Sequence, residues 1–141
     1  MEGSKVYFDT NIFIYFLETD EKFFEVCAPF FKAVEDSVFS GCCGDAVICE
    51  LLVKPMESNN LLRIKSIKSL FGSNGYFTPL SHTREIFEMT AFIRATQRLK
   101  FADAIHIATA IDAGCTHFVT HDKKIVSSAL GIKVIDIAEL V

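Results

Sequence analysis

Four acidic residues occupy the same kind of place in this sequence, the point where an apolar run passes into a helical pattern. Asp9 follows "KVYF", Glu50 follows "DAVIC", and Asp122 comes just after "HFVT". Asp103 lies in the first turn of the Ala- and Ile-rich segment "FADAIHIATAIDAGC". Taken singly, each acid is explained by helix capping, because carboxylates accept the unpaired N–H groups of a first turn and complement the helix dipole.

The coincidence of the four acids indicates a cation site. Two carboxylates about 4 Å apart repel by roughly 4 kcal/mol at an effective dielectric of 20, so four together need a positive charge. Oxygen ligands with no nearby Cys or paired His suit Mg²⁺ or Mn²⁺, which also bind substrate phosphate. The sequence predicts phosphodiester chemistry: Asp9, Asp103 and Asp122 bind the metal, and Glu50, with its longer side chain, ligates it or orients the attacking water.

Polar neighbours of these acids have two interpretations each. Asn11 either orients a carboxylate or a water, or is an ordinary residue of a helix start. Thr120 either hydrogen-bonds to Asp122 or ends a β-branched strand. His106 and His121 lie close to two of the acids in sequence, but a single histidine is more often packed or solvated than catalytic, and neither is predicted to be a metal ligand.

Basic residues cluster in sequence next to two of the acids. Arg94, Arg98 and Lys100 precede Asp103, and Lys123 follows Asp122. The formal net charge is -4, so a general attraction to nucleic acid is absent and RNA binding would depend on such local groups. We predict these four basic residues as RNA contacts, with a solvated helix face as the alternative.

The pattern of strands and helices explains how distant acids would meet. Short β-branched or apolar runs predict strands in "VYF", "DAVIC", "YFTPL", "THFVT" and "IKVIDIAEL". Apolar residues at helical spacing separate these runs, and parallel neighbours in a sheet require such helical crossovers. We therefore predict an α/β sandwich with a mostly parallel central sheet flanked by helices. In such a sheet the strand ends that lead into helices share one edge, where ligand sites form.

Boundaries within the helical segments follow from capping and breaking residues. A helix is expected at roughly 21–40, with "SGCCG" interrupting the pattern after it. Pro55 should break the next helix or turn the chain, and Ser81 should cap a later one. The early phenylalanines exceed what one domain obviously needs inside, so some are expected to form an exposed partner surface; they are Phe13, Phe16, Phe23, Phe24, Phe30 and Phe31.

Length and composition point to one well-cored domain over residues 1–141. The chain has 141 residues, half of them hydrophobic, and no apolar stretch near the roughly 18 residues that span a bilayer. It has five Cys residues without a C-x-x-C pair, which disfavours a disulfide framework or a structural zinc site. With no signal-peptide pattern at the N-terminus, a soluble cytoplasmic protein is expected.

These motifs resemble those of PIN-domain ribonucleases and, within that family, of the bacterial and archaeal toxins called VapC. The matching stretches are "FDTNIFI" with Asp9 and Asn11, "CELLVKP" with Glu50, "FADAIHIATAIDAG" with Asp103, and "FVTHDKKI" with Thr120 and Asp122. The ordered set spans almost the whole chain. Two positions depart from the family pattern: no Ser or Thr closely precedes Glu50, and His121 stands where Asn is common.

The resemblance implies a PIN-like three-layer sandwich and a Mg²⁺- or Mn²⁺-dependent endonuclease that cleaves single-stranded RNA. It also implies a toxin that forms homodimers and is inhibited by a small cognate antitoxin. The alternative is a PIN-like module that binds RNA or protein without cutting, although four retained acids favour catalysis.

Two other classes are disfavoured by single positions. A haloacid-dehalogenase-like phosphatase needs a second Asp two residues after the first, where this chain has Asn11. A Rossmann nucleotide binder needs a glycine-rich first turn, and "DTNIF" contains no glycine.

Overall fold

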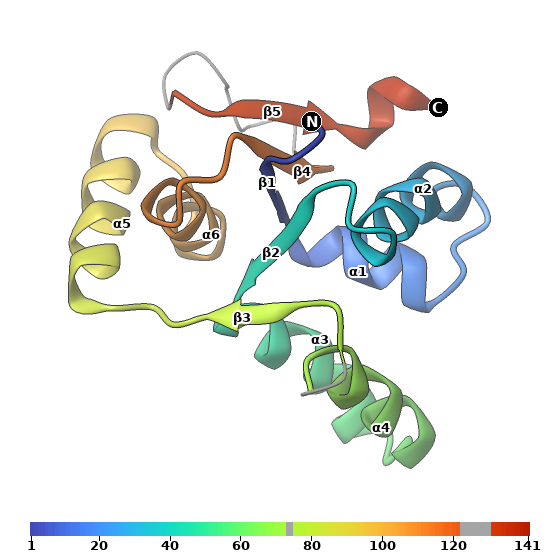
Figure 1. Cartoon of the computed structure of the whole chain (residues 1–141). Coiled ribbons are helices and arrows are strands. Elements are labelled where there is room, and N and C mark those ends of the chain that lie inside the picture. Colours follow the sequence, from blue (N-terminus) through green and yellow to red (C-terminus); the bar gives the residue numbers. More distant parts are fainter. Residues whose placement is uncertain (73–74, 122–130) are drawn as a thin grey trace.

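Five parallel strands form the central sheet of the protein (Figure 1). The computed structural model describes residues 1–72, 75–121 and 131–141. The strands are β1 (Lys5–Phe8), β2 (Ser40–Gly44), β3 (Thr78–Leu80), β4 (His117–Thr120) and β5 (Lys133–Asp136), in the spatial order β3-β2-β1-β4-β5. The predicted parallel sheet is confirmed.

Helices cover both faces of this sheet and complete a three-layer sandwich. They are α1 (Thr10–Leu17), α2 (Phe24–Glu35), α3 (Asp45–Glu57), α4 (Leu61–Leu70), α5 (Arg84–Gln97) and α6 (Phe101–Asp112). Figure 1 shows α1 and α2 on one side of the strands and α5 and α6 on the other, with α3 and α4 side by side beyond β2 and β3. A short 3₁₀ turn, Ile137–Leu140, follows β5.

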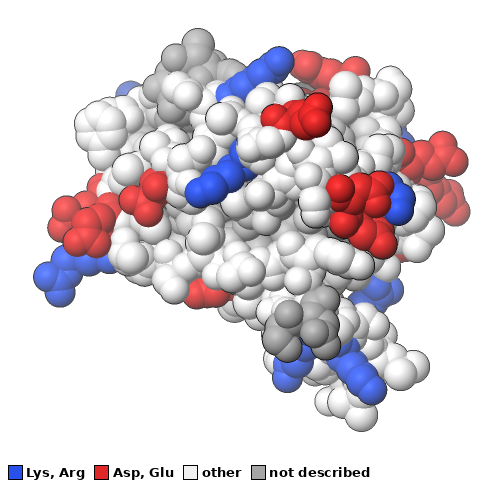
Figure 2. All heavy atoms as spheres, in the orientation of Figure 1, with Lys and Arg blue, Asp and Glu red and all other residues white. Residues whose placement is uncertain are grey.

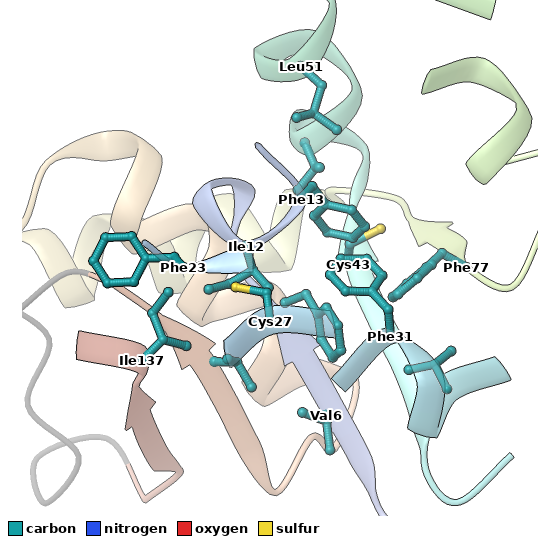
Figure 3. Close-up of a cluster of buried hydrophobic side chains, with 14 of the residues drawn as sticks. Val6, Ile12, Phe13, Phe23, Cys27, Phe31, Cys43, Leu51, Phe77 and Ile137 are labelled. Carbon is teal, nitrogen blue, oxygen red and sulfur yellow. The ribbon is translucent and has the colours of Figure 1, made fainter. Parts of the chain in front are cut away.

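The layer between the sheet and helices α1 and α2 is rich in phenylalanine. Phe8 of β1 lies edge-on to Phe31 and Phe77, with ring centroids 5.2 and 5.3 Å apart. Phe13 of α1 packs against the same two rings at 5.5 and 5.0 Å. Figure 3 shows this cluster continuing to Leu51 of α3. Aromatic pairs of this kind add about 0.5–1.5 kcal/mol each beyond the area they bury.

The layer between the sheet and helices α5 and α6 is built from smaller residues. Ala104, Ala108 and Ala110 let α6 approach the sheet closely, and Tyr7 and Phe118 lie beneath it as stacked rings with centroids 5.3 Å apart. This side also buries polar groups, described with the candidate site below.

The prediction for the second strand was wrong by about five residues. "SGCCG" is the strand β2, and "DAVIC", predicted as the strand, begins helix α3. Packing overrides the β-branched pattern here, because a Cβ on Gly41 would lie 2.6 Å from a ring carbon of Phe77 and 2.8 Å from Val34. Only a residue without a side chain permits that approach at this central strand.

Predictions for three helices were also wrong. Helix α3 continues through Pro55 to Glu57. Proline lacks a backbone N–H, but it stands in the last turn, so the helix loses only one hydrogen bond near its end. Helix α5 begins after Thr83, whose hydroxyl accepts a hydrogen bond from the N–H of Ile86, and Ser81 lies outside the helix. Helix α2 is shorter than predicted and spans Phe24–Glu35.

The predicted exposed surface of early phenylalanines is absent from the described residues. Phe13, Phe23 and Phe31 are buried and the other three are half-buried. The exposed phenylalanines are instead on α5 and at the start of α6: Phe87, Phe92 and Phe101. Within the described ranges, no helix combines the length and the apolarity needed to cross a bilayer.

Candidate active site

Asp9 lies at the carboxyl end of β1 and is the N-cap of α1, so its capping role and its predicted site role coincide. Its Oδ1 accepts a hydrogen bond of 2.8 Å from the backbone N–H of Thr10. Its Oδ2 accepts one of 2.8 Å from the hydroxyl of Thr120, at the end of the neighbouring strand β4. The residue is only 5% exposed. The carboxylate is therefore fixed in orientation by two strands and one helix.

Burial raises the pKa of the Asp9 carboxyl above its usual range. Nearby His106 and the hydrogen bonds from Thr120 and Thr10 act in the opposite direction, and the charge of Glu50 adds to the rise. The charged form of this group is disfavoured where it stands, so a neighbouring cation would stabilise it.

Glu50 reaches the same place from the second turn of α3. Its Oε1 accepts hydrogen bonds of 2.9 Å from the hydroxyl of Thr10 and 2.6 Å from Nε2 of His106. Burial raises the Glu50 pKa, but the hydrogen bond and charge of His106, with that of Thr10, outweigh it and leave the pKa lowered. The side chain is 37% exposed, so Glu50 is a charged carboxylate open to solvent on one side.

Thr10 joins the two acids. Its backbone N–H binds Asp9 and its hydroxyl binds Glu50, residues that are 41 positions apart in the chain. The sequence patterns gave no reason to single out Thr10, because a Thr after a capping Asp is common in helix starts. Its signal was position alone, directly after the first acid.

Two histidines that the sequence patterns did not assign to the site connect its elements. His106 of α6 accepts or donates a 2.7 Å hydrogen bond at Nδ1 with the hydroxyl of Tyr7, in addition to its bond with Glu50. His82, before α5, accepts from the N–H of Ala46 at 3.0 Å. Its Nδ1 lies 2.9 Å from the hydroxyl of Thr109 on α6. Both histidines thus join α3 to α6.

Asp103 lies in the first turn of α6, three residues before His106 and therefore on the same side of the helix. It is half-buried. Asp122 and Lys123, also predicted for the site, lie outside the described residues. Asn11 is exposed in the first turn of α1.

The predicted metal ligands are only partly testable within the described ranges. Their oxygen chemistry suits Mg²⁺ or Mn²⁺, and the buried Asp9 carboxylate would be stabilised by a cation. However, no three His, Cys, Asp or Glu side chains of the described residues are close enough to hold a metal ion. A metal ion at this edge of the sheet would need ligands beyond the described side chains.

A fifth acid lies at the same edge of the sheet. Asp136 ends β5 and pairs in register with Thr120. Its Oδ1 caps the 3₁₀ turn by accepting from the N–H of Ala138 at 2.9 Å. The same oxygen lies 3.6 Å from Nδ1 of His121, too far for a hydrogen bond, and that ring packs against Phe23. Asp136 therefore ends its strand beside Thr120, the residue that binds Asp9.

Three of the four predicted RNA-contacting residues lie between the last turn of α5 and the start of α6. Arg94 lies in the last turn of α5, Arg98 ends that helix in a left-handed conformation with φ 55°, and Lys100 precedes α6. All three are exposed. On the face in Figure 2, acidic and basic side chains are interspersed, and the basic ones at its lower end lie over α4, which carries Arg63, Lys65 and Lys68.

An apolar groove of about 250 Å³ leads away from Glu50. Helix α1 contributes Ile14 and Leu17, α3 contributes Leu51, and α4 contributes Ile67. Arg63, which donates to the backbone oxygen of Leu17, lies at the same groove among charged neighbours.

A family model described as "PIN domain" matches residues 6–129. The chain therefore belongs to the PIN domain family, and the recognition based on its motifs is confirmed. A search of curated proteins finds no significant match.

Solved structures of toxin–antitoxin proteins share the fold over nearly the whole chain. A toxin–antitoxin complex from Klebsiella pneumoniae has a TM-score of 0.69 at 21% identity, covering 94% of this chain and 97% of the other. FitAcB from Neisseria gonorrhoeae has a TM-score of 0.70 at 15% identity, covering 94% and 98%. VapC20 of Mycobacterium tuberculosis, a toxin that cleaves the sarcin–ricin loop, has 0.67 at 15%, covering 90% and 95%.

Proposed function

We propose that this protein is a Mg²⁺- or Mn²⁺-dependent endoribonuclease and the toxin of a toxin–antitoxin pair. The observation that supports it most is the meeting of Asp9 and Glu50 on Thr10, at the sheet edge where α/β proteins bind ligands. PIN-domain proteins are generally nucleases, and one structure of the same fold is an RNA-cleaving toxin.

The acids would divide the work by their placement. Asp9, Asp103 and Asp122 would hold the cation, which when bound supplies an acidified water and offsets phosphate charge. Glu50 would orient the attacking water through its solvent-facing side, since the other side is held by Thr10 and His106. Thr120 would keep Asp9 in place, and Asn11 is assigned the same supporting role at the helix start.

Basic side chains near α6 would hold the RNA backbone. Arg94, Arg98 and Lys100 are exposed close to the helix start that carries Asp103, and Lys123 is assigned the same role from its sequence position. Contacts of this type position the substrate without reading its sequence.

The cognate antitoxin would occupy the apolar groove that begins at Glu50. Its lining of Ile14, Leu17, Leu51 and Ile67 fits an apolar segment of a partner, and the groove reaches the acid that the partner would have to cover. The structures of similar fold include toxin–antitoxin complexes. Homodimers would use the exposed rings of Phe87 and Phe101, which stack with centroids 6.3 Å apart.

The nuclease proposal is tested by Asp9→Asn, which keeps the shape of the side chain and removes its charge. We expect wild-type protein to cleave single-stranded RNA only with Mg²⁺ or Mn²⁺. In Asp9→Asn, cleavage and Mn²⁺ affinity measured by calorimetry should fall together, by about 100-fold or more for cleavage. The matched control is Asp112→Asn, an exposed acid at the far end of α6, which should cleave as wild type does.

Two results would contradict the proposal. Cleavage by Asp9→Asn at the wild-type rate over a range of metal concentrations would remove its central residue. If wild-type protein does not bind metal and does not cleave RNA, the alternative is favoured, a PIN-like module that binds RNA or protein without cutting.

A further inference from the structure

A chain of hydrogen bonds runs from Tyr7 of strand β1 through the core to Glu50. The hydroxyl of Tyr7 lies 2.7 Å from Nδ1 of His106, and Nε2 of the same ring lies 2.6 Å from Oε1 of Glu50. Three elements, β1, α3 and α6, are joined by these two contacts.

In this series of hydrogen bonds, one assignment of donors and acceptors satisfies both contacts. Burial raises the pKa of the Tyr7 hydroxyl above its usual range, so this group keeps its proton. The proton of the Tyr7 hydroxyl is directed at Nδ1 of His106, the hydrogen-bond partner of that hydroxyl. A ring that accepts at Nδ1 carries its own proton at Nε2, where it donates to Glu50.

The His106 ring is enclosed, which excludes direct contact with a substrate. Its exposure is 1%, and Tyr7 is 0% exposed beneath it. Both ring nitrogens are within hydrogen-bond distance of protein atoms. The ring therefore acts on the site through the residues it contacts there, Glu50 and Thr10.

Glu50 is held by one oxygen and free at the other. Both of its hydrogen bonds, from Thr10 and from His106, go to Oε1, and among the described residues none goes to Oε2. The two donors hold Oε1 and leave Oε2 open to a cation or water. The arrangement holds a flexible side chain in one orientation.

Gly44 maintains this arrangement by its lack of a side chain. A Cβ at this position would lie 2.8 Å from the hydroxyl oxygen of Tyr7 and would collide with the ring of His82. The strand backbone can approach Tyr7 this closely only because residue 44 is glycine.

We propose that His106 is a positioning residue of this site, which holds Oε1 of Glu50 so that Oε2 faces the bound cation or water, and that Tyr7 sets the ring tautomer. The role rests on the proposed nuclease function. The proposal adds two residues to the site, His106 and Tyr7, which contact neither substrate nor metal. The acids are the residues that would contact them.

The first test measures the tautomer in the metal-free full chain. Long-range ¹H–¹⁵N correlation spectra should show His106 of wild-type protein protonated at Nε2 and unprotonated at Nδ1. Tyr7→Phe removes the donor and should give a mixture of the two tautomers at the same pH. A wild-type ring protonated at Nδ1, or at both nitrogens, would overturn the direction of the chain.

The second test separates positioning from a merely structural role. His106→Gln keeps an amide N–H near the position of Nε2, and His106→Leu fills similar space without a donor. We expect Mn²⁺ affinity by calorimetry and kcat to fall about 10-fold or more in His106→Leu. In His106→Gln both should stay within about 3-fold of wild type, and KM for RNA should be unchanged in both variants.

The matched control is His117→Gln, a histidine at the start of β4, at the opposite edge of the sheet, which should behave as wild type. If His106→Leu fails to fold, the comparison of His106→Gln with Tyr7→Phe still decides, because Tyr7→Phe should lower kcat and His106→Gln should not. If Mn²⁺ affinity and kcat are equal in wild type and His106→Leu, the positioning role of His106 is wrong, while the nuclease function stands. Wild-type protein inactive with every metal would instead overturn the nuclease function, and the role of His106 with it.

Discussion

The two faces of the central sheet are stabilised in different ways. On the side of α1 and α2, rings of Phe8, Phe13, Phe31 and Phe77 pack with centroids 5.0–6.0 Å apart. On the side of α5 and α6, small aliphatic residues surround buried polar groups that hydrogen-bond to one another. Burial of rings has less directional preference than hydrogen bonds, which fix angles. We therefore expect the first side to supply more of the stability and the second to fix the geometry of the candidate site.

The difference explains where the site is placed. A catalytic carboxylate must be held within a fraction of an ångström, and hydrogen bonds from rigid elements achieve this better than apolar contacts. Glu50 belongs to α3 but is held by His106 of α6, and Asp9 belongs to the end of β1 but is held by Thr120 of β4. Both acids are oriented by elements other than their own.

The largest effect on stability is expected on the phenylalanine side. Phe13→Ala removes a fully buried ring that packs against Phe31 and Phe77, and it should lower the free energy of unfolding by about 3–5 kcal/mol. Urea denaturation monitored by circular dichroism measures the change. Leu62→Ala on the surface of α4, 82% exposed, is the control and should change it by less than about 0.5 kcal/mol. Similar losses in both variants would contradict the assignment of the core.

A smaller loss is expected on the polar side. Thr109→Val keeps the volume of the side chain and removes the hydroxyl that hydrogen-bonds to Nδ1 of His82. His82 is half-buried, so its Nδ1 would lose this protein partner in a partly exposed place. The free energy of unfolding should fall by about 1 kcal/mol. Thr90→Val is the matched control, because the Thr90 hydroxyl donates only to Ile86 within its own helix, and its loss should be near zero. If the free energy of unfolding falls more in Thr90→Val than in Thr109→Val, hydrogen bonds between elements are not worth more than those within one helix, and the prediction is wrong.

The sequence predicted the elements whose pattern is local. Alternating strands and helices gave the parallel sheet, and Asp9 was placed at the end of a strand because "VYF" is apolar and "DTNIF" begins a helix. The strand β2 was missed because two of its five residues are Gly, which has a low strand preference. Its identity depends on the close approach of Phe77 to Gly41, a contact between residues far apart in the chain.

The hydrogen-bond chain of the site could not be predicted for the same reason. In sequence, Tyr7 is indistinguishable from an apolar residue of a buried strand, and its hydroxyl partner lies 99 positions away in His106. The four acids were predicted because each lies near an expected helix start. The residues that orient the acids carry no such mark, since their role depends on tertiary contacts alone.

The smallest effect has the opposite sign and concerns the buried charge of Asp9. Burial raises the folded-state pKa of this acid, so its charged form opposes folding once the pH rises above the ordinary Asp value of 3.8. Asp9→Asn stays neutral, so without metal its Tm should exceed that of wild type at pH 7. The difference should shrink as the pH falls toward 3.8. The lowered pKa of Glu50 stabilises the fold at neutral pH and is lost in acid, but it is common to both proteins and cancels.

Thermal melts from pH 4 to pH 8 in the presence of EDTA measure this difference, and Mn²⁺ should reverse it. A cation that binds only the folded protein raises Tm in proportion to its affinity, and wild-type Asp9 should bind it more tightly than the variant. The carboxylate would then oppose folding of the metal-free chain and favour it once the ion is bound. A lower Tm for Asp9→Asn in EDTA at pH 7 would show that the hydrogen bonds from Thr10 and Thr120 outweigh burial. In that case Asp9 would act chiefly as a helix cap. Its hydrogen bonds would then stabilise the fold as well as orient the carboxylate, and the difference between the two sides of the sheet would be smaller than we infer.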